Sequence, residues 1–244
     1  MDTSLDERSE SKRPSDARGC RVLFSVARWS AWAPDETAPR KRPEIPEVPM
    51  LLRRRASFAD CLALRVAFDC AGSLGPMPAV FCSRYGEVHR SVEMLEALSK
   101  NEPFSPMTFG LSVHNAAAAL YSIARADTSA TSTVAAGRDS LPEGVLEACG
   151  LLASGAPRVL LVAYDDVLPE AFGAYADAGD RPAALGLVLE PAGEGACSLE
   201  LAHSEEPELA PSEPQVASVA RFLKDGGRAL EIRSGARLWL WSRA

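Results

Sequence analysis

The chain has 244 residues, of which 47% are hydrophobic and 24% charged, a composition that supports one sizeable buried core and excludes a wholly disordered chain. Residues 1–55 hold 12 basic and 9 acidic residues (+3), whereas the rest holds 14 and 24 (−10), which argues against nucleic acid as a partner of the folded part. With no apolar run of membrane-spanning length, no signal peptide and six cysteines without a C-x-x-C pair, we expect a cytoplasmic protein with reduced thiols, no membrane span and no metal site.

The N-terminal part predicts a disordered tail followed by one strand. Residues 1–19 are rich in Ser, Asp, Glu, Lys and Arg and lack apolar spacing, so we expect them to be disordered. Residues 21–26 are typical of a strand, and residues 33–49 are rich in proline and charge, which indicates an irregular connection. The main domain is expected to span residues 20–200.

Three helices and a short strand are expected next. Apolar residues recur at helical spacing in residues 57–70, 87–100 and 114–125. Residues 80–82 form a short strand between the first two helices. The third helix is rich in alanine, and its small side chains allow a close approach to a neighbouring element.

The region that follows predicts a strand, a tight turn, a helix and a second strand. Residues 128–134 are mostly β-branched and favour a strand, and Gly137 allows a sharp turn. Ser140, with Pro142 and Glu143, predicts a capping box at the start of a helix. The helix has one apolar face and ends at Gly155 and Pro157; its apolar positions are Leu141, Val145, Leu146, Cys149 and Leu152. Residues 159–163 form a short apolar run of the buried-strand kind.

The C-terminal part predicts another strand in the main domain and then an extension. Residues 184–190 favour a strand. Residues 201–244 are expected to form an acidic, proline-containing linker at 205–214, a short helix at 215–224 and a strand-like end at 230–241. Trp239 and Trp241 share one face of that strand by alternation, which packing alone explains.

The turn before Ser140 is the most informative feature of the chain. A strand-to-helix turn is a common place for an activated nucleophile, because the helix N-terminus stabilises a thiolate or an oxyanion. Here Val134, Ala135, Ala136 and Gly137 offer no reactive group. On spacing alone, the pattern is also that of an ordinary βαβ unit.

Several segments together resemble a known family. These are residues 104–123 (FSPMTFGLSVHNAAAALYSI), 131–137 (TSTVAAG) and 158–166 (RVLLVAYDD), with 53–58 (RRRASF) and 79–86 (AVFCSRYG) upstream. They resemble the N-terminal half of a β-ketoacyl synthase of the thiolase superfamily. More closely, they resemble the β-ketoacyl synthase-like, N-terminal domain family, whose members are often labelled chain-length factors. The resemblance implies an α/β fold, the N-terminal half of a thiolase-like fold, with a mixed sheet and covering helices.

Two departures from complete synthases bear on function. The resemblance places the nucleophilic cysteine at Val134, or at Ala135 if the turn is one residue shorter, and neither residue can attack a thioester. It also places the catalytic histidines in a second half of the fold, and His89, His114 and His203 all fall in the first half or the tail. We therefore expect no catalytic residue and no cofactor of the protein's own, although a substrate carried on phosphopantetheine remains compatible.

A few polar residues are candidates for a binding role. His114 and Asn115 could donate hydrogen bonds to an acyl thioester, or simply brace the start of the alanine-rich helix. Asp165 and Asp166 follow a strand but point in different directions, so we expect them to end it and not to act as an acid/base pair. The cluster of Arg53, Arg54 and Arg55 is either a docking patch for an acidic carrier protein or its phosphopantetheine phosphate, or a solvated flank of a helix.

Three functions remain open at this level. The first is a non-catalytic subunit that pairs with a complete β-ketoacyl synthase. The second is an acyltransferase or hydrolase that uses Ser132, Thr133 or another hydroxyl in place of the cysteine, although no Ser/His/Asp arrangement can be assigned. The third is a stand-alone module that binds acyl carrier protein. A homodimer is compatible with the sequence, and residues 200–244 could cover the face that a second half would otherwise cover.

Overall fold

The computed structural model describes residues 20–34, 41–103, 105–177, 179–193, 197–203 and 214–243. The predicted disordered tail at 1–19 and nearly all of the predicted acidic linker lie outside these residues. Within them, no helix is both long enough and apolar enough to span a membrane.

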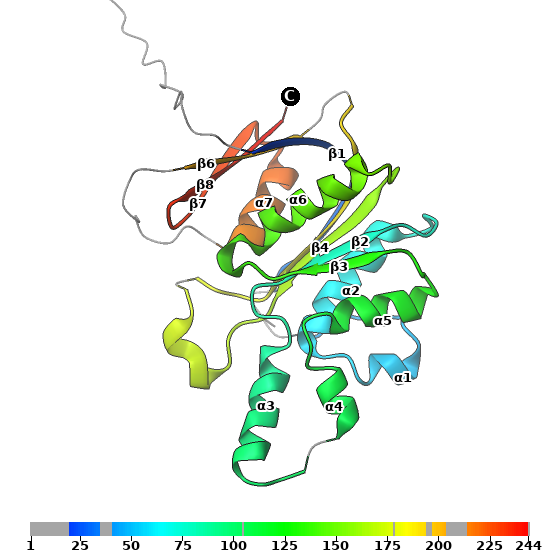
Figure 1. Cartoon of the computed structure of the whole chain (residues 1–244), viewed down its shortest axis with the longest axis vertical. Helices are drawn as coiled ribbons and strands as arrows, with labels where there is room; N and C mark the ends of the chain where they lie inside the picture. Colours follow the sequence, from blue (N-terminus) through cyan, green and yellow to red (C-terminus); the bar gives the residue numbers. More distant parts are fainter. Residues whose placement is uncertain are drawn as a thin grey trace, which may run out of the picture.

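One mixed sheet organises the molecule (Figure 1). The strand order is β3-β2-β4-β5-β1-β6-β8-β7, and β3, β2 and β4 are parallel whereas every other pair is antiparallel. The strands are β1 (Arg21–Trp32), β2 (Ala79–Cys82), β3 (Thr131–Val134), β4 (Val159–Asp165), β5 (Ala183–Pro191), β6 (Cys197–His203), β7 (Ala229–Ser234) and β8 (Arg237–Arg243). The strand that leads into the turn of interest, β3, is therefore at one edge of the sheet.

Helices cover both faces of this sheet, in agreement with the covering helices that the resemblance implied. The helices are α1 (Met50–Arg53), α2 (Phe58–Ala71), α3 (Val88–Ser99), α4 (Pro106–Gly110), α5 (Ala116–Arg125), α6 (Ser140–Ala153) and α7 (Gln215–Asp225), with short 3₁₀ turns at Gly137–Asp139 and Glu170–Tyr175. Helices α2 and α5 pack on one face, and α6 and α7 pack on the other. Helices α3 and α4 project from one end of the body (Figure 1).

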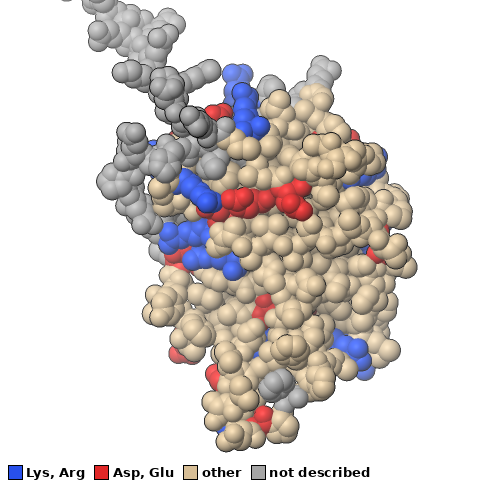
Figure 2. All heavy atoms as spheres, in the orientation of Figure 1, with Lys and Arg blue, Asp and Glu red and all other residues tan. Residues whose placement is uncertain are grey.

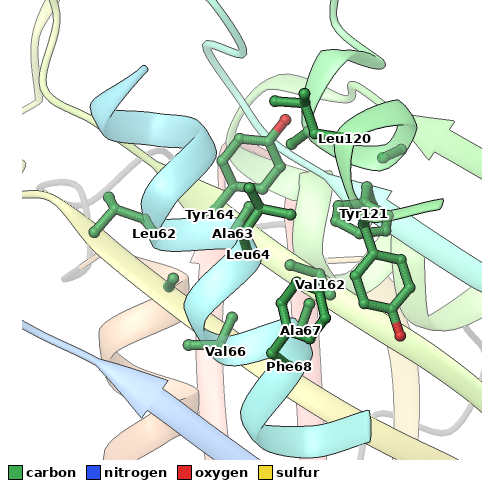
Figure 3. Packing of buried hydrophobic residues seen from close by; sticks show 14 of the residues in the cluster. Leu62, Ala63, Leu64, Val66, Ala67, Phe68, Leu120, Tyr121, Val162 and Tyr164 are labelled. Carbon is green, nitrogen blue, oxygen red and sulfur yellow. The ribbon is translucent and has the colours of Figure 1, made fainter. Parts of the chain in front are cut away.

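The central strand β4 carries side chains into both hydrophobic cores. Leu160, Val162 and Tyr164 pack against α2 and α5, whereas Val159 and Leu161 pack against α6. Figure 3 shows Val162 and Tyr164 among the side chains of α2 and α5. Strand residues alternate between the two faces, and a parallel strand with helices on both sides is apolar at every position. This explains why residues 159–163 form an uninterrupted apolar run.

Glycines allow both helical layers to approach the sheet closely. A Cβ atom on Gly186 of β5 would lie 2.7 Å from the carbonyl oxygen of Val66 in α2. On the other face the glycine is in the helix, because a Cβ on Gly144 of α6 would lie 2.9 Å from the Sγ atom of Cys82. Each close approach therefore depends on a residue without a side chain.

The structure corrects three predictions. Strand β1 continues past Val26 to Trp32 through a bulge, because its second half pairs with β5. The C-terminal segment is a hairpin of two strands, not one strand, because the chain reverses at Gly235, whose φ is 56°. Strand β6 was not predicted at all.

The predicted capping box at Ser140 is also wrong. Asp139 occupies the N-cap position of α6, and no side chain caps the helix there. The Oγ atom of Ser140 instead accepts a hydrogen bond from the Ala136 amide at 3.0 Å and donates one to the Gly137 carbonyl at 2.8 Å. Ser140 thus stabilises the turn, and the helix start depends on other groups.

Candidate functional site at the head of α6

The turn between β3 and α6 presents only aliphatic side chains at the four predicted positions. Val134 is the last residue of β3, pairs with Cys82 of β2 and packs against the α6 side of the core. Ala135 and Ala136 follow, and Gly137 has a φ of 60°, a left-handed conformation that favours glycine. The assignment of Val134 or Ala135 to the position of the synthase cysteine stays a prediction.

Arg138, the residue after the glycine, binds a carboxylate from a distant loop. Its Nε and Nη2 atoms donate to the two oxygens of Asp177, at 2.8 and 2.5 Å. Arg84 donates to the same carboxylate at 2.5 Å, and the two guanidinium groups lower the pKa of Asp177. The segment that contains the 3₁₀ turn Glu170–Tyr175 is thereby fastened to the head of α6.

Asp139 is the buried carboxylate at the head of α6, with 8% of its surface exposed. It accepts hydrogen bonds from Nε1 of Trp239 at 2.9 Å, from Nη1 of Arg237 at 3.1 Å and from Nε2 of Gln215 at 3.4 Å. A negative charge at a helix N-terminus is also favoured by the helix dipole. The head of α6 is therefore bound by groups from α7 and β8.

The C-terminal part of the chain packs against α6. Val219, Phe222 and Leu223 of α7 belong to the same hydrophobic cluster as Leu141 and Val145 of α6. Figure 1 shows α7 lying beside α6. Residues 214–243 thus extend the sheet and cover part of the face that carries α6.

A second, half-buried carboxylate, that of Asp165, connects β4 to the end of β2. Asp165 accepts hydrogen bonds from the Ser83 hydroxyl at 2.7 Å and from the amides of Arg84 and Tyr85, both at 2.9 Å. Burial raises the pKa of Asp165 to about 6, although these hydrogen bonds oppose the shift. Its neighbour Asp166 lies 3.3 Å from Nε2 of His89 instead, so the two carboxylates serve different contacts, as the sequence predicted.

His114 braces the backbone near this site. Its Nε2 atom lies 3.0 Å from the carbonyl oxygen of Ser83, and its ring packs on Gly86, where a Cβ atom would lie 2.9 Å away. Asn115 is exposed at the N-cap position of α5, and its side chain makes no capping hydrogen bond. This contact favours the bracing interpretation of His114, and the acyl-binding role of both residues stays a prediction.

The structure does not bring Ser132 and Thr133 together with a histidine, the base that a Ser/His/Asp arrangement needs. The Ser132 hydroxyl donates to the Glu147 carboxylate at 2.8 Å, and Thr133 is exposed on the other face of β3. Among the described residues, neither hydroxyl contacts a histidine. Neither Ser132 nor Thr133 therefore belongs to a Ser/His/Asp arrangement within the part of the chain that the structure describes.

The arginines at residues 53–55 lie at the end of α1 and are all exposed. The backbone carbonyls of Arg53 and Arg55 accept hydrogen bonds from Arg42 and Arg90. The three guanidinium groups themselves have no ion-pair partner among the described residues. The patch is accessible to an anionic partner, and its docking role stays a prediction.

Sequence reasoning missed Arg138, Asp139, Arg84 and Asp177. Asp177 is 39 residues from Arg138, and Trp239 is 100 residues from Asp139. No local motif joins positions so far apart. The only available signal was the alternation that predicted a buried face for Trp239, and it did not identify the partner of the indole N–H.

Comparisons with known proteins agree with the resemblance found in the sequence. Residues 29–242 match the family model described as β-ketoacyl synthase, N-terminal domain. The chain is similar to a chain in the structure of a ketosynthase (ApeO) in complex with its chain length factor (ApeC) from Xenorhabdus doucetiae, with 26% identity, a TM-score of 0.81, and coverage of 91% of this chain and 100% of that chain.

Two longer proteins match less of their own length. The ishigamide ketosynthase/chain length factor has 19% identity and a TM-score of 0.48, and the match covers 75% of this chain and 56% of that chain. A β-ketoacyl synthase from Burkholderia phymatum STM815 has 16% identity and a TM-score of 0.49, with coverage of 62% and 46%. No curated protein matches the chain. The matched family model spans most of the chain, and this protein therefore belongs to the β-ketoacyl synthase, N-terminal domain, family, with the N-terminal half of a thiolase-like fold.

Proposed function

We propose that this protein is a non-catalytic, chain-length-factor-like subunit that pairs with a complete β-ketoacyl synthase and shapes how the acyl chain is handled. The process would be type II fatty acid, polyketide or aryl-polyene-type biosynthesis. The observation that carries the proposal is the head of α6. Its turn has no nucleophile among Val134–Gly137, and its two charged residues, Arg138 and Asp139, are engaged in internal hydrogen bonds.

The similarity to a chain in a ketosynthase and chain length factor complex supports the pairing. That chain is matched over its whole length, with a TM-score of 0.81. A protein without its own nucleophile contributes to condensation most directly by binding a subunit that has one. The substrate would then be carried on phosphopantetheine, and this chain would need no cofactor of its own.

The edge of the sheet at β3 supplies a suitable surface for a partner. Thr131 and Thr133 are exposed on this outer strand, whose free backbone groups can pair with another strand. From residue 103 to 137 the sequence contains only two charged residues, Arg125 and Asp127. Figure 2 shows few charged side chains on the face around β3 and α5, below the acidic row over α6.

Apolar side chains add to this surface. Met107, Phe109 and Ile123 are 51%, 57% and 63% exposed, respectively. Interface cores are poor in charged residues and rich in apolar and aromatic ones, and exposed apolar side chains in a region with few charges fit that composition. We therefore assign the ketosynthase contact to β3, α4 and α5.

Co-purification tests the pairing. Tagged protein is expressed in its native cells, separated by size-exclusion chromatography, and co-eluting proteins are identified by mass spectrometry. We expect a full-length ketosynthase at near-equal stoichiometry. Recovery of a lone monomer or a homodimer would contradict the proposal.

Matched variants locate the contact. The double variant Thr131→Lys, Thr133→Lys places two charges on exposed positions of β3 and should release the ketosynthase without unfolding the chain. Leu23→Lys, at a 55% exposed position of β1 far along the sheet, should retain it. If both variants retain the ketosynthase, pairing is supported but the β3 face is the wrong surface.

The arginine patch is proposed to bind the carrier protein. Replacing Arg53, Arg54 and Arg55 by glutamate should weaken carrier-protein binding in a titration, and replacing them by lysine should largely preserve it. Binding should also weaken as salt is added, because exposed charges are screened. Unchanged affinity of the glutamate variant would show that the patch is only a solvated flank.

A further inference from the structure

The α3–α4 arm, residues 88–103 and 105–110, is attached to the body without core packing of these described residues. Neither α3 nor α4 has a buried residue. Four of the arm's apolar side chains, Leu95, Leu98, Met107 and Phe109, are between 51% and 60% exposed. Figure 1 shows that the arm projects from the end of the molecule. The contacts at its base must therefore determine its orientation.

A polar cluster with two buried carboxyl groups lies at that base, and we call Ser57, Asp60, Glu87 and Arg90 the basal cluster. Ser57 donates its hydroxyl to Glu87 Oε1 at 2.7 Å, and its amide donates to Asp60 Oδ2 at 2.8 Å. Arg90 contacts both carboxyl groups, with Nε 3.1 Å from Glu87 Oε2 and Nη2 3.5 Å from Asp60 Oδ2. Glu87 is the N-cap residue of α3, so the cluster connects α2 directly to the start of the arm.

Arg90 also connects the C-terminal end of the arm to the body. Its Nη1 atom donates to the carbonyl oxygen of Leu111, the residue that follows α4, at 3.1 Å. Its Nη2 atom donates to the carbonyl oxygen of Arg55, just before α2. A single guanidinium group thus holds both ends of the arm against α2.

The basal cluster has more acid than base. Asp60 is 0% and Glu87 is 4% exposed, and among the described residues Arg90 is the only guanidinium group that forms an ion pair with them. The Oδ1 atom of Asp60 is buried and has no hydrogen-bond partner among the described residues. Burial and the nearby charge of Asp60 raise the pKa of Glu87 to about 8, and burial raises that of Asp60 as well.

Other titratable groups surround the pair without neutralising it. Cys61 on α2 and Tyr164 on β4 lie on the inner side, where burial raises both pKa values. On the outer side, a cavity of about 290 Å³ is lined by Glu87 and Arg90 together with His89, Glu93 and Asp166. Glu87 lines this cavity, which gives its buried carboxyl group a path to solvent, and no further arginine or lysine of the described residues lines it.

We propose that the arm is held in its observed orientation by one proton shared between the carboxyl groups of Asp60 and Glu87, and that loss of this proton releases the arm. With the proton present, one carboxylate faces one guanidinium, and the charges balance. When the proton leaves to solvent through the cavity, two buried carboxylates face Arg90, and the base of the arm can relieve their repulsion by opening. The orientation of the apolar side chains on α3 and α4 then depends on pH.

Hydrogen–deuterium exchange of the full chain tests this proposal. Exchange is measured from pH 6.5 to 9.5, corrected for the intrinsic pH dependence, in peptides from α3 and, as an internal reference, from α6. Protection of α3 should be constant below pH 8 and then fall by up to about tenfold for each further pH unit, while protection of α6 stays constant. Equal loss in both helices, or none in α3, would overturn the proposal.

Three variants make the test specific. Glu87→Gln keeps the shape of the protonated side chain and should abolish the pH dependence in α3. Asp60→Asn should do the same by removing the other carboxylate, which keeps the test valid if one variant folds poorly. Glu93→Gln, at the cavity rim on the same helix, should behave as the parent chain does. A fall in protection in Glu87→Gln equal to that of the parent would reject the shared proton. These measurements need no partner, so their outcome is independent of the proposed function.

Discussion

The N-terminal ends of α2 and α6 are stabilised in different ways. In α2, Ser57 and Asp60 form a capping box, with the Ser57 hydroxyl and the Asp60 carboxylate each accepting from the other residue's amide at 2.8 Å. In α6, Asp139 is held by Trp239 and Arg237, which are about 100 residues away. The start of α2 is thus encoded within four residues, whereas the start of α6 depends on the C-terminal hairpin.

Trp239→Ala should have the largest effect on this difference. The side chain is fully buried, so its removal should lower the free energy of unfolding by about 3–5 kcal/mol, measured by urea denaturation. Trp29→Ala, at a 41% exposed position, should cost far less. Trp239→Phe retains most of the burial and isolates the indole hydrogen bond to Asp139, with an expected cost of about 1–3 kcal/mol. A negligible cost for Trp239→Ala would mean that the hairpin does not anchor α6.

Gly186→Ala and Gly144→Ala test how tightly the two helical layers rest on the sheet. Each should cost about 1–3 kcal/mol, and Gly186→Ala should cost more, because its new Cβ would meet the backbone of α2. Gly150→Ala is the control within α6, since a Cβ there has no atom within 4 Å. That change should stabilise the protein by about 0.5–1 kcal/mol through helix propensity. If Gly144→Ala is as favourable as Gly150→Ala, α6 is not packed as closely as the structure has it.

Ser57→Ala breaks the local cap of α2. The expected loss is about 1 kcal/mol, because the amide of Asp60 loses its acceptor. Exchange protection should decrease in the first turn of α2 and at the base of the arm, since Ser57 also binds Glu87. Protection of α6 should not change. If Ser57→Ala lowers the free energy of unfolding as much as Trp239→Ala does, the start of α2 is not stabilised by local contacts alone.

Asp177→Asn should have the smallest effect. The ion pairs with Arg84 and Arg138 are partly exposed, so we expect a loss of less than about 1 kcal/mol. The pKa of Asp177 is lowered in the folded state, so its contribution is complete at neutral pH and is lost only as the pH falls below 3.8. Limited proteolysis should reveal faster cleavage at Glu170–Tyr175 in the variant at neutral pH. Unchanged cleavage would mean that Asp177 does not fasten this segment.

The elements with strong periodicity were predictable, and those that depend on pairing were not. Helices α2, α3, α5, α6 and α7 and strand β4 lie where apolar spacing placed them, within a few residues. The second half of β1 has no buried residue, with Ser30 and Trp32 half-buried and the others exposed, so apolar spacing does not mark it and its pairing with β5 makes it a strand. Strand β6 joins the sheet only through β1 and β8.

The candidate site shows the same division. The absence of a nucleophile at Val134–Gly137 could be predicted from the sequence, because it depends only on the identity of four consecutive residues. The contacts of Arg138 and Asp139 could not be predicted, because their partners come from other elements. Ser140 illustrates the limit: the motif was typical of a capping box, but the hydroxyl binds the turn instead.

By itself, the sequence determined the family, the alternation of strands and helices, and the aliphatic turn before α6, since these follow from short-range spacing and residue type. Only the tertiary structure decided what surrounds that turn: the clamp of Arg84 and Arg138 on Asp177, the burial of Asp139 against Trp239, and the acidic pair of Asp60 and Glu87 that shares one arginine. These arrangements depend on which distant groups folding places within hydrogen-bonding distance and away from water. Burial and proximity set the charge states and strengths of these contacts, and neither is a property of any short stretch of sequence.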